Sequence, residues 1–375
     1  PSRRMKDKVR VLHILPSVRG YGAERLIVEL LKYLPSDEVE AELLTIYEPP
    51  AHAREALPFN VFDAGRKDRR DRLFMCRLVR EIRRCNPDIV HTHTHVGKYW
   101  GRVAALLAGT KQIVHTEHNP CDFRRTVMER VADWILHRVT ARVVTFFREQ
   151  GTALVERESL PKQKLVLIPN GLTLPQPTED RAPARQRLGI RSDQFAIMTV
   201  GRMEYQKNHV LALRAFALLP ESVRKRAVLF FAGSGKEEVV LRGLAFALHI
   251  GEQVRFLGCR NDVPELLAGA DLLLMTSWFE GMPLTLLEAM LAGVPIVSTP
   301  WLGARNMLAD GRYGFLTPGF EPAHVAAQIE RTLAHPTVRR EIAERARQHV
   351  TSTCDIRQMA DAHRRMYLNL SGVAS

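Results

Sequence analysis

Hydrophobic positions along the chain gather in short strand-like runs that alternate with longer amphipathic helical patterns. In the first half the runs occupy residues 9–15, 41–47, 87–93, 111–118 and 141–147, and in the second half residues 195–201, 227–233, 253–258, 271–277 and 294–299. This alternation is typical of parallel sheets covered by helices. Between the two sets, residues 168–183 (IPNGLTLPQPTEDRAP) show neither period, which indicates a connection between domains. We therefore predict an α/β protein with two Rossmann-like, doubly wound domains facing a central cleft, where ligands bind at the carboxyl ends of the strands.

Composition agrees with a globular protein of two domains. The chain has 375 residues, of which 46 % are hydrophobic and 25 % charged, and this excludes wholesale disorder. No apolar run approaches the roughly 18 residues that a membrane span needs. The five cysteines are scattered and form no C-x-x-C pair, which suits reduced thiols better than disulfides or a zinc site. We expect a cytoplasmic protein.

The net charge of +13 is unevenly distributed. Residues 1–175 hold 30 Lys and Arg against 21 Asp and Glu, a net charge of +9. This excess indicates attraction to an anionic partner, although a merely solvated basic surface explains it as well.

Two glutamates lie eight positions apart in an apolar segment, SWFEGMPLTLLEAM. Glu280 follows the strand at 271–277, Gly281 shapes the next turn, and Glu288 lies in a predicted helix. Free N–H groups at the start of such a helix attract anions. We expect the two acids to flank a phosphate cradle formed by the N–H groups of Leu284, Thr285 and Leu286.

Two other loops carry candidate anion-binding residues. Arg202 and Lys207 follow the strand at 195–201 and can together clamp a diphosphate, while two surface cations are the simpler alternative. Gly233 begins a Gly-x-Gly turn that lets a ligand approach the backbone. In the first half, Gly20 and Gly22 open a helix after the first strand, but Arg25 replaces the third glycine of a dinucleotide-binding motif.

These segments, taken in order, resemble the retaining glycosyltransferases of family 4, which have the GT-B fold (glycosyl transferases group 1). The resemblance rests on GYGAER, PDIVHTH, VHTEH, IPNGL, VGRMEYQKN, FAGSGKE and the long block GCRNDVPELLAGADLLLMTSWFEGMPLTLLEAMLAGVPIV. It implies an acceptor-side domain at 1–170, a nucleotide-sugar domain at 171–352, and a helix at 353–375 that returns to the first domain. Tyr21 replaces a glycine that the family usually has, and Arg148 replaces a common serine, so the acceptor is less well defined than the donor.

The resemblance also implies roles for individual residues. Arg202 and Lys207 bind the donor diphosphate, and Glu288 binds the ribose hydroxyls. Glu280 and His118 hold the transferred sugar. The remaining positions are Gly22, near both substrates, Arg260 by the base, and Tyr21 and His93 on the acceptor side. Cationic side chains and helix N–H groups can stabilise a departing diphosphate without a metal, and the chain lacks a D-x-D motif. We therefore expect neither a metal nor another cofactor.

Five histidines offer a competing interpretation. His91, His93 and His95 alternate along one predicted strand and share a face, with His115 and His118 on the next strand. Such a group could bind zinc, but no accompanying carboxylate pattern supports a metal-dependent hydrolase.

A basic helix is predicted within residues 66–86, with Leu73, Phe74, Leu78, Val79 and Ile82 facing inward and arginines facing water. Family members commonly dock on anionic membranes through basic residues of this domain, and we expect peripheral attachment to the inner face of the membrane. Nucleic acid is not expected, because no aromatic residues interleave with the basic ones.

The sequence therefore predicts a retaining glycosyltransferase that moves a sugar from a nucleotide-sugar to a lipid-linked or saccharide acceptor in cell-surface glycan synthesis. A UDP-sugar is the first choice of donor and GDP-mannose the second. The alternatives are a nucleotide-sugar epimerase of the same fold and a non-catalytic nucleotide-sugar-binding protein.

Overall fold

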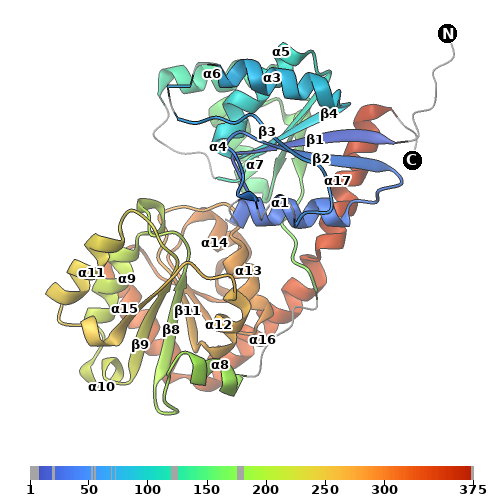
Figure 1. Cartoon of the computed structure of the whole chain (residues 1–375). Coiled ribbons are helices and arrows are strands. Elements are labelled where there is room, and N and C mark those ends of the chain that lie inside the picture. The colour runs from blue at the N-terminus through green and yellow to red at the C-terminus, as the bar shows by residue number, and fades with distance from the viewer. Residues whose placement is uncertain are drawn as a thin grey trace, which may run out of the picture. The chain divides into compact units, whose positions relative to one another are not determined.

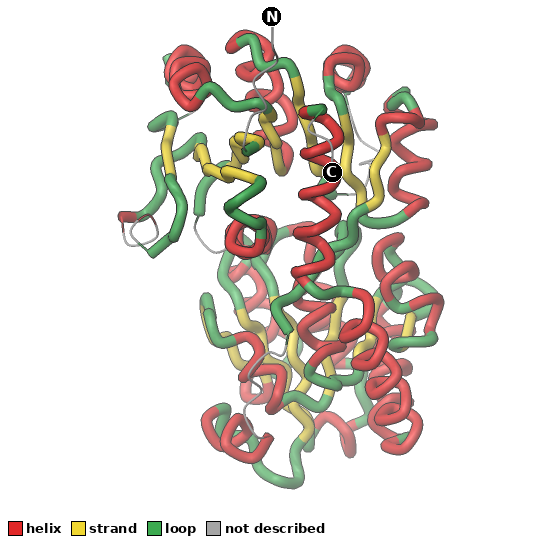
Figure 2. Tube along the Cα trace, turned by 90° about the vertical axis from the view of Figure 1, so that its right-hand side faces the viewer, coloured by secondary structure: helices red, strands yellow, loops and turns green. Residues whose placement is uncertain are grey.

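The structure is a computed structural model, and it describes residues 8–18, 22–51, 54, 56–68, 70–71, 73–119, 126–174 and 181–372. The chain divides into two compact units. Unit 1 comprises residues 1–173 and 356–375, and unit 2 comprises residues 174–355. In each unit the strands (yellow in Figure 2) lie between helices (red).

Unit 1 is built on a parallel sheet with the strand order β3-β2-β1-β4-β5-β6-β7. Its strands are β1 (Val9–Leu15), β2 (Val39–Thr45), β3 (Val61–Asp63), β4 (Ile89–His93), β5 (Gln112–Thr116), β6 (Arg142–Thr145) and β7 (Leu165–Leu167). Its helices are α1 (Gly22–Tyr33), α3 (Phe74–Cys85), α4 (Thr94–Val96), η1 (Gly97–Gly101), α5 (Arg102–Ala108), α6 (Val127–Val139), α7 (Arg148–Glu158), η2 (Lys162–Lys164) and α17 (Ile356–Ser371).

Helices cover both faces of this sheet. Helices α3, α5 and α6 lie on one side, and α1 and α17 lie on the other (Figure 1). Helix α17 comes from the C-terminal end of the chain and contacts α1 and β1. Its residues Met359, Met366 and Tyr367 are buried, so the last helix of the chain completes the core of unit 1.

Unit 2 contains a second parallel sheet, with the order β10-β9-β8-β11-β12-β13. Its strands are β8 (Phe195–Val200), β9 (Ala227–Ala232), β10 (Val254–Gly258), β11 (Leu272–Met275), β12 (Ile296–Ser298) and β13 (Phe315–Leu316). The helices that precede or follow them are α8 (Arg181–Arg187), η3 (Tyr205–Lys207), α9 (His209–Ala217), α10 (Glu221–Arg224), α11 (Glu238–Ala247), η4 (Gly251–Gln253), α12 (Val263–Gly269), α13 (Leu284–Leu291), α14 (Leu302–Met307), η5 (Ala309–Gly311), α15 (Pro322–Ala334) and α16 (Pro336–Thr353).

The predicted class of two parallel α/β sheets is confirmed. The strands are short and rich in Val, Ile, Leu and Phe because both faces of a parallel sheet are covered, and every residue of β9 is buried. Each unit has its own core. Ile197, Phe216 and Leu229 belong to that of unit 2, and Leu12, Leu78 and Val90 to that of unit 1.

The basic helix differs from the prediction in two respects. It begins at Phe74, and Leu73 is 67 % exposed instead of facing inward, whereas Phe74, Leu78 and Ile82 are buried as expected. Arg77 is not simply solvated. It donates to the carbonyl oxygens of Ala64 (2.7 Å) and Gly65 (3.0 Å), and so ties α3 to the turn after β3. Arg69 and Arg72 lie outside the described residues.

Candidate active-site residues

The strand order of unit 2 reverses between β8 and β11. From β8 the chain proceeds to β9 and β10 on one side, and from β11 it proceeds to β12 and β13 on the other. Loops that follow two such strands diverge and leave a crevice at their carboxyl ends, where open α/β sheets bind ligands. Lys207 follows β8 and Glu280 follows β11. The fold thus places these two predicted residues at the expected binding point of unit 2.

Lys207 and Glu280 form an ion pair. The Lys207 Nζ atom lies 2.8 Å and 2.7 Å from the two carboxylate oxygens of Glu280. Ser277 donates its hydroxyl to Glu280 Oε1 at 2.6 Å. The side chains of Lys207 and Glu280 are 17 % and 8 % exposed, so water screens the pair weakly. An anion or a sugar hydroxyl entering here meets a fixed ammonium and a fixed carboxylate.

Hydroxyl and amide side chains hold the two loops together. Thr276 donates to the carbonyl oxygens of Lys207 (3.2 Å) and Asn208 (3.0 Å). Gln206 donates to the Phe279 carbonyl at 3.0 Å. The sequence analysis missed Thr276, Gln206 and Ser277. For Thr276 and Ser277 the available signal was their position at the end of a buried strand, where a buried hydroxyl needs a hydrogen-bond partner.

Glycines allow the loops after β8 and β9 to touch. Gly201 and Gly233 have φ angles of +143° and +148°, which side chains rarely adopt. A Cβ atom on Gly233 would lie 2.0 Å from the Gly201 carbonyl oxygen. The sequence predicted that Gly233 lets a ligand approach the backbone closely. In the structure its lack of a side chain is required for contact between two backbone segments.

Arg202 and Arg260 lie in ion pairs near the surface. Arg202 is 3.1 Å from Glu204, with side chains 50 % and 36 % exposed. Arg260 pairs with Asp262, which raises the pKa of the arginine through a side-chain hydrogen bond. Arg202 and Lys207, which are predicted to clamp a diphosphate together, thus lie in separate ion pairs with Glu204 and Glu280.

Helix α13 begins at Leu284, after Pro283, and carries Glu288. Leu284 and Thr285 are half-buried at its start, and Gly281 is buried in the preceding loop. The N–H group of Leu286 donates to the Pro283 carbonyl at 3.2 Å. The expectation that all three N–H groups are free is thus wrong for Leu286. Glu288 is 4 % exposed, so this residue is buried and does not lie on the open surface.

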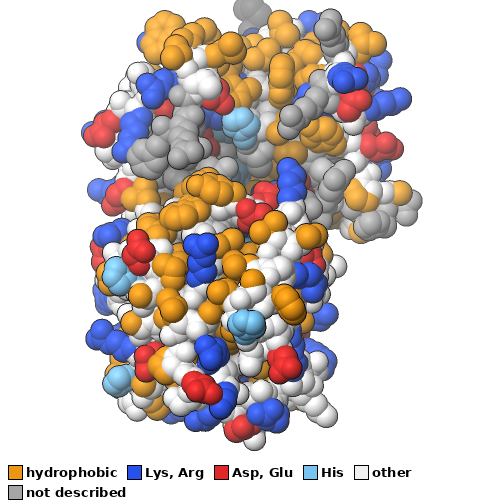
Figure 3. Space-filling view, turned by 90° about the vertical axis from the view of Figure 1, so that its left-hand side faces the viewer, with side chains coloured by type: hydrophobic (Ala, Val, Ile, Leu, Met, Phe, Trp, Pro, Cys, Tyr) orange, Lys and Arg blue, Asp and Glu red, His pale blue; other side chains and the backbone are white. Residues whose placement is uncertain are grey.

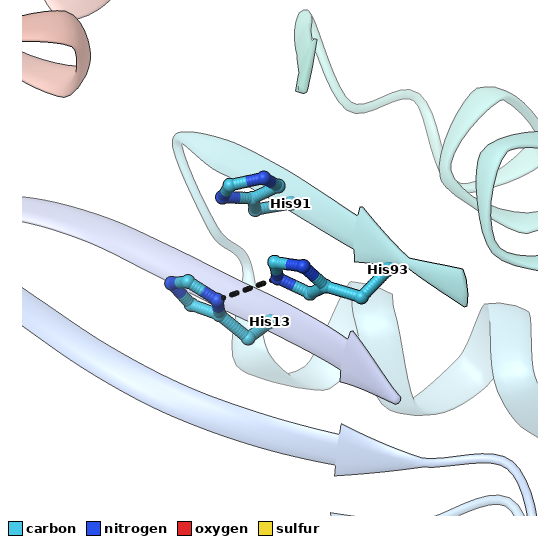
Figure 4. A group of neighbouring side chains, drawn as sticks. All are labelled: His13, His91 and His93. Carbon is cyan, nitrogen blue, oxygen red and sulfur yellow. Dashed lines mark hydrogen bonds between the residues drawn. The ribbon is translucent and has the colours of Figure 1, made fainter. Parts of the chain in front are cut away.

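In unit 1 the predicted histidines separate into two environments. His91 and His93 lie on one face of β4, as their spacing predicts, and they meet His13 of β1 (Figure 4). His118 follows β5, and its Nε2 atom lies 3.3 Å from His93 Nδ1. Burial lowers the pKa of His118 to about 4, so the imidazole is neutral at pH 7.

The other two histidines do not join this group. His115 lies 3.0 Å from the Thr92 hydroxyl and faces Glu117, and His95 packs against the Tyr99 ring. Gly22 is exposed at the start of α1, with open space where a Cβ would lie. Tyr21 lies outside the described residues. Sequence reasoning missed His13, which stands alone in an apolar strand.

A buried ion cluster supports the segment that carries His118. Lys98 Nζ lies 2.8 Å from Glu117, 3.3 Å from Asp133 and 3.0 Å from Glu158, and the Lys98 side chain is 1 % exposed. Lys98 holds the pKa of the Glu117 carboxyl well below its usual range, although burial alone opposes this. Asp133, His137 and Glu158 lie close enough to hold a metal ion, but the Lys98 ammonium already contacts two of these three residues.

Comparisons with known families find a match in each half of the chain. Residues 180–349 match the family described as glycosyl transferases group 1, and residues 21–174 match glycosyltransferase family 4. The chain is 24 % identical over 328 residues to the UDP-Gal:alpha-D-GlcNAc-diphosphoundecaprenol alpha-1,3-galactosyltransferase of Escherichia coli, covering 83 % of this chain and 84 % of that protein. It is 30 % identical over 236 residues to the lipopolysaccharide glucosyltransferase WaaG of E. coli strain K12, covering 62 % of each.

Solved structures show the same fold at low identity. Anabaena HepE, in its complex with UDP and glucose, has a TM-score of 0.83 at 20 % identity and covers 97 % of this chain and 100 % of that one. The WaaG crystal structure has a TM-score of 0.77 at 21 % identity, with 95 % and 99 % covered. The two family matches cover most of the chain, one in each half. The protein therefore belongs to the group 1 glycosyltransferases and has the GT-B fold.

Proposed function

We propose that this glycosyltransferase moves a sugar from a UDP-sugar, with retention of anomeric configuration, to a lipid-linked or saccharide acceptor of a cell-surface glycan. The observation that carries the proposal is the Lys207–Glu280 pair at the strand-order reversal of unit 2. The choice of UDP is supported by a relative whose name specifies UDP-Gal and by a similar structure solved in complex with UDP and glucose. The acceptor class is supported by two relatives named for a diphosphoundecaprenol-linked sugar and for lipopolysaccharide.

The proposed roles follow from the charges that develop when a sugar–phosphate bond breaks. Negative charge grows on the departing diphosphate, and Lys207 supplies a fixed ammonium that stabilises it. Positive charge grows on the sugar ring, and Glu280 supplies a carboxylate that accepts sugar hydroxyls. Glu288 binds the ribose, Arg202 and Arg260 extend the donor site toward the phosphates and the base, and neutral His118 binds the sugar. These residues supply the charge stabilisation themselves, so we propose that turnover needs no metal.

A donor panel tests the proposal. Purified protein is incubated with UDP-glucose, UDP-galactose, UDP-N-acetylglucosamine and GDP-mannose, with and without polyprenyl-diphosphate-linked sugar, and nucleotide release is measured. We expect acceptor-dependent release of UDP that persists in EDTA. No release from any donor would favour the non-catalytic binder, and interconversion of donors without release would favour the epimerase. Complete loss in EDTA, restored by a divalent ion, would contradict the metal-free proposal.

We further propose that unit 1 docks on an anionic membrane surface through α6. This helix is inverted relative to an ordinary surface helix. Its buried face carries the polar residues Asp133 and His137, which meet Lys98 and Glu158. Its outward face is apolar, with exposed fractions between 39 % and 82 % at Val127, Met128, Val131, Trp134, Ile135 and Val139. Clustered exposed apolar residues of this kind mark an interaction site.

The charges on α6 favour an anionic lipid surface as the partner. Arg130 and Arg138 are exposed beside the apolar face, and the Arg138 guanidinium stacks on Trp134, 3.5 Å from the ring centroid. Glu129 is occupied in the capping box with Thr126. Basic and aromatic residues on one face are typical of helices that lie in a membrane interface. Hydrophobic side chains gather over the upper part of unit 1 in Figure 3, on the side where α3, α5 and α6 lie in Figure 1. Within the described ranges, no helix is both long and apolar enough to cross a bilayer.

Replacing Met128, Val131 and Ile135 by glutamine is expected to reduce binding to anionic vesicles at least tenfold, because the helix loses the apolar area that enters the interface. The measurement is co-sedimentation with phosphatidylcholine vesicles containing or lacking 30 % phosphatidylglycerol, at about 0.1 M and about 1 M salt. High salt should weaken the wild-type interaction, since screening shortens from about 10 Å to about 3 Å.

The matched control carries glutamine at three exposed apolar positions of unit 2, Val239, Val240 and Phe246 of α11. It should bind vesicles like the wild type. Equal binding of wild type and α6 variant would contradict the assignment. A concentration-dependent dimer that disappears in the α6 variant would show instead that a second copy covers this face.

A further inference from the structure

A single chain of polar contacts runs through the buried histidines of unit 1. Its members, in order, are Thr116, His91, Tyr367, His13, His93 and His118. Four of its five contacts are buried, and its third member, Tyr367, comes from the C-terminal helix α17. His13 and Tyr367 are 354 positions apart in the sequence.

Each contact of the chain fits a hydrogen bond. His91 Nε2 lies 2.8 Å from the Thr116 hydroxyl, and His91 Nδ1 lies 2.6 Å from the Tyr367 hydroxyl. The same hydroxyl lies 3.3 Å from His13 Nε2. His13 Nδ1 lies 3.0 Å from His93 Nε2, as Figure 4 shows, and the last contact joins His93 Nδ1 to His118 Nε2 at 3.3 Å.

The imidazoles of this chain are neutral at pH 7. Burial lowers the pKa of His13 to about 3 and that of His118 to about 4, and it lowers those of His91 and His93 well below their ordinary value. A neutral imidazole carries one N–H donor and one acceptor nitrogen. Each imidazole can therefore donate one hydrogen bond and accept one within this series. If every contact is a hydrogen bond, all of them run in the same direction, either from Thr116 to His118 or from His118 to Thr116.

The position of Tyr367 selects between the two arrangements. A phenol O–H is a stronger acid than a neutral imidazole N–H, and O–H donors make shorter hydrogen bonds than N–H donors. The short contact of 2.6 Å is thus the one in which Tyr367 donates to His91 Nδ1. At the longer contact of 3.3 Å, His13 Nε2–H donates to the tyrosine oxygen.

This choice propagates to His118. Because His13 carries its proton on Nε2, its Nδ1 accepts from His93 Nε2–H, and His93 Nδ1 in turn accepts from His118 Nε2–H. His118 is left with an unprotonated Nδ1. That nitrogen can accept a hydrogen bond from a sugar hydroxyl, and it disfavours an anionic group such as a sugar carboxylate.

We propose that Tyr367 of the C-terminal helix is a positioning residue that fixes the tautomer of His118 through His13 and His93, so that His118 presents an acceptor to a hydroxyl of the substrate sugar. The inference rests on the proposed function only for the identity of that hydroxyl group. The tautomer itself is a property of the free protein.

Removing the tyrosine hydroxyl is expected to reverse the direction of the hydrogen bonds between His13, His93 and His118. In the Tyr367→Phe variant, a proton on His13 Nε2 would be buried without an acceptor, which is unfavourable. His13 should then carry its proton on Nδ1 and donate to His93, and His118 should change to the Nδ1–H tautomer. A variant at the far end of the chain, Thr116→Val, should produce the same reversal, because His91 loses the acceptor for its Nε2–H.

The experiment uses full-length protein labelled with ¹⁵N-histidine at pH 7.5, without donor. Two-bond ¹H–¹⁵N spectra report which nitrogen of each ring is protonated, and the His118 signal is assigned with His118→Gln. We expect Nε2–H at His118 in the wild type and Nδ1–H in both variants. Tyr99→Phe is the matched control, since the Tyr99 hydroxyl contacts Asp133 at 3.3 Å outside this chain, and it should leave the tautomer unchanged.

Kinetics then separate this inference from the proposed function. We expect kcat to fall at least tenfold in Tyr367→Phe while the affinity for UDP alone changes less than twofold. An Nδ1–H tautomer at His118 in the wild type, or no change in either variant, would overturn the inference whatever the enzyme transfers. Stoichiometric zinc in the purified protein would also overturn it, because His13, His91 and His93 lie close enough to share an ion and their lone pairs would then be occupied. A tautomer change without sugar transfer by the wild type would leave the inference intact and contradict the proposed function.

Discussion

Lowering the pH from 7.5 to about 5.5 is expected to unfold unit 1, while unit 2 stays folded. Among the described residues of unit 1, five histidines that are at most 1 % exposed have pKa values that burial lowers strongly: His13, His91, His93, His115 and His363. In the unfolded chain these groups take up protons near pH 6.5, but in the folded unit His13 and His115 do so only near pH 3 and His363 near pH 4. Protons therefore favour the unfolded state in this interval.

The direction and size of the effect follow from linkage. The stability is fully present above pH 6.5 and is lost as the pH falls toward the folded-state pKa values. Each histidine contributes a loss of about 1.4 kcal/mol per pH unit below 6.5. Five of them together remove about 7 kcal/mol by pH 5.5, which is comparable to the whole stability of a typical domain.

Hydrogen exchange measured by mass spectrometry at pH 7.5, 6.5 and 5.5 distinguishes the two units within one sample, after correction for the intrinsic pH dependence of exchange. Peptides from β1, β4 and α17 should lose protection together. Peptides from β8 and β9 serve as the internal control, because the described part of unit 2 buries fewer histidines of this kind, with His209 the principal one. Retained protection of β1 and β4 at pH 5.5 would contradict the prediction.

Replacing Lys207 by methionine is expected to lower kcat/KM at least a hundredfold. Methionine keeps most of the side-chain volume and removes the charge. The proposed diphosphate loses a charged hydrogen bond, a loss of about 1.5–3 kcal/mol, and Glu280 keeps its charge with its ammonium partner gone. The loss of the diphosphate contact and the loss of the ammonium that positions Glu280 both lower kcat/KM.

Arg202→Met is the matched comparison. Arg202 is half-exposed and pairs with Glu204, so we expect a loss of about tenfold, consistent with one charged contact to the donor. Steady-state kinetics with UDP-sugar and calorimetric titration with UDP measure both variants. An effect below twofold at Lys207, in protein that unfolds at the wild-type temperature, would contradict the diphosphate assignment.

The local pattern was sufficient to predict the class of fold and the proximity of Lys207 and Glu280. Strand-like runs alternating with helical ones predict parallel sheets, and the carboxyl ends of neighbouring parallel strands lie at one edge. Lys207 and Glu280 could therefore be assigned to a common region although 73 positions separate them. Position directly after a strand was sufficient for this assignment, because such a loop must lie at the carboxyl edge of the sheet.

Spacing does not decide which partner an exposed side chain takes. Arg202 precedes Lys207 by five positions, yet it pairs with the nearby Glu204. A flexible, exposed arginine can reach several carboxylates, and spacing does not decide among them. Helix α6 shows a related limit of sequence patterns. A period of apolar residues identifies a helix but not the direction of its apolar face, and here the buried Lys98 cluster draws the polar face inward.

By itself, the sequence determined the alternation of elements, the glycine turns and the loops that carry Lys207 and Glu280, because each depends on neighbours within a few positions. Only the tertiary structure decided that His13, His91 and His93 meet Tyr367 from the last helix, and that Lys98 lies among three carboxylates. These contacts join segments that are far apart in the sequence, and the local sequence of one segment does not indicate its partner. They form because a buried polar group must find a partner wherever the packed helices and strands bring one within reach.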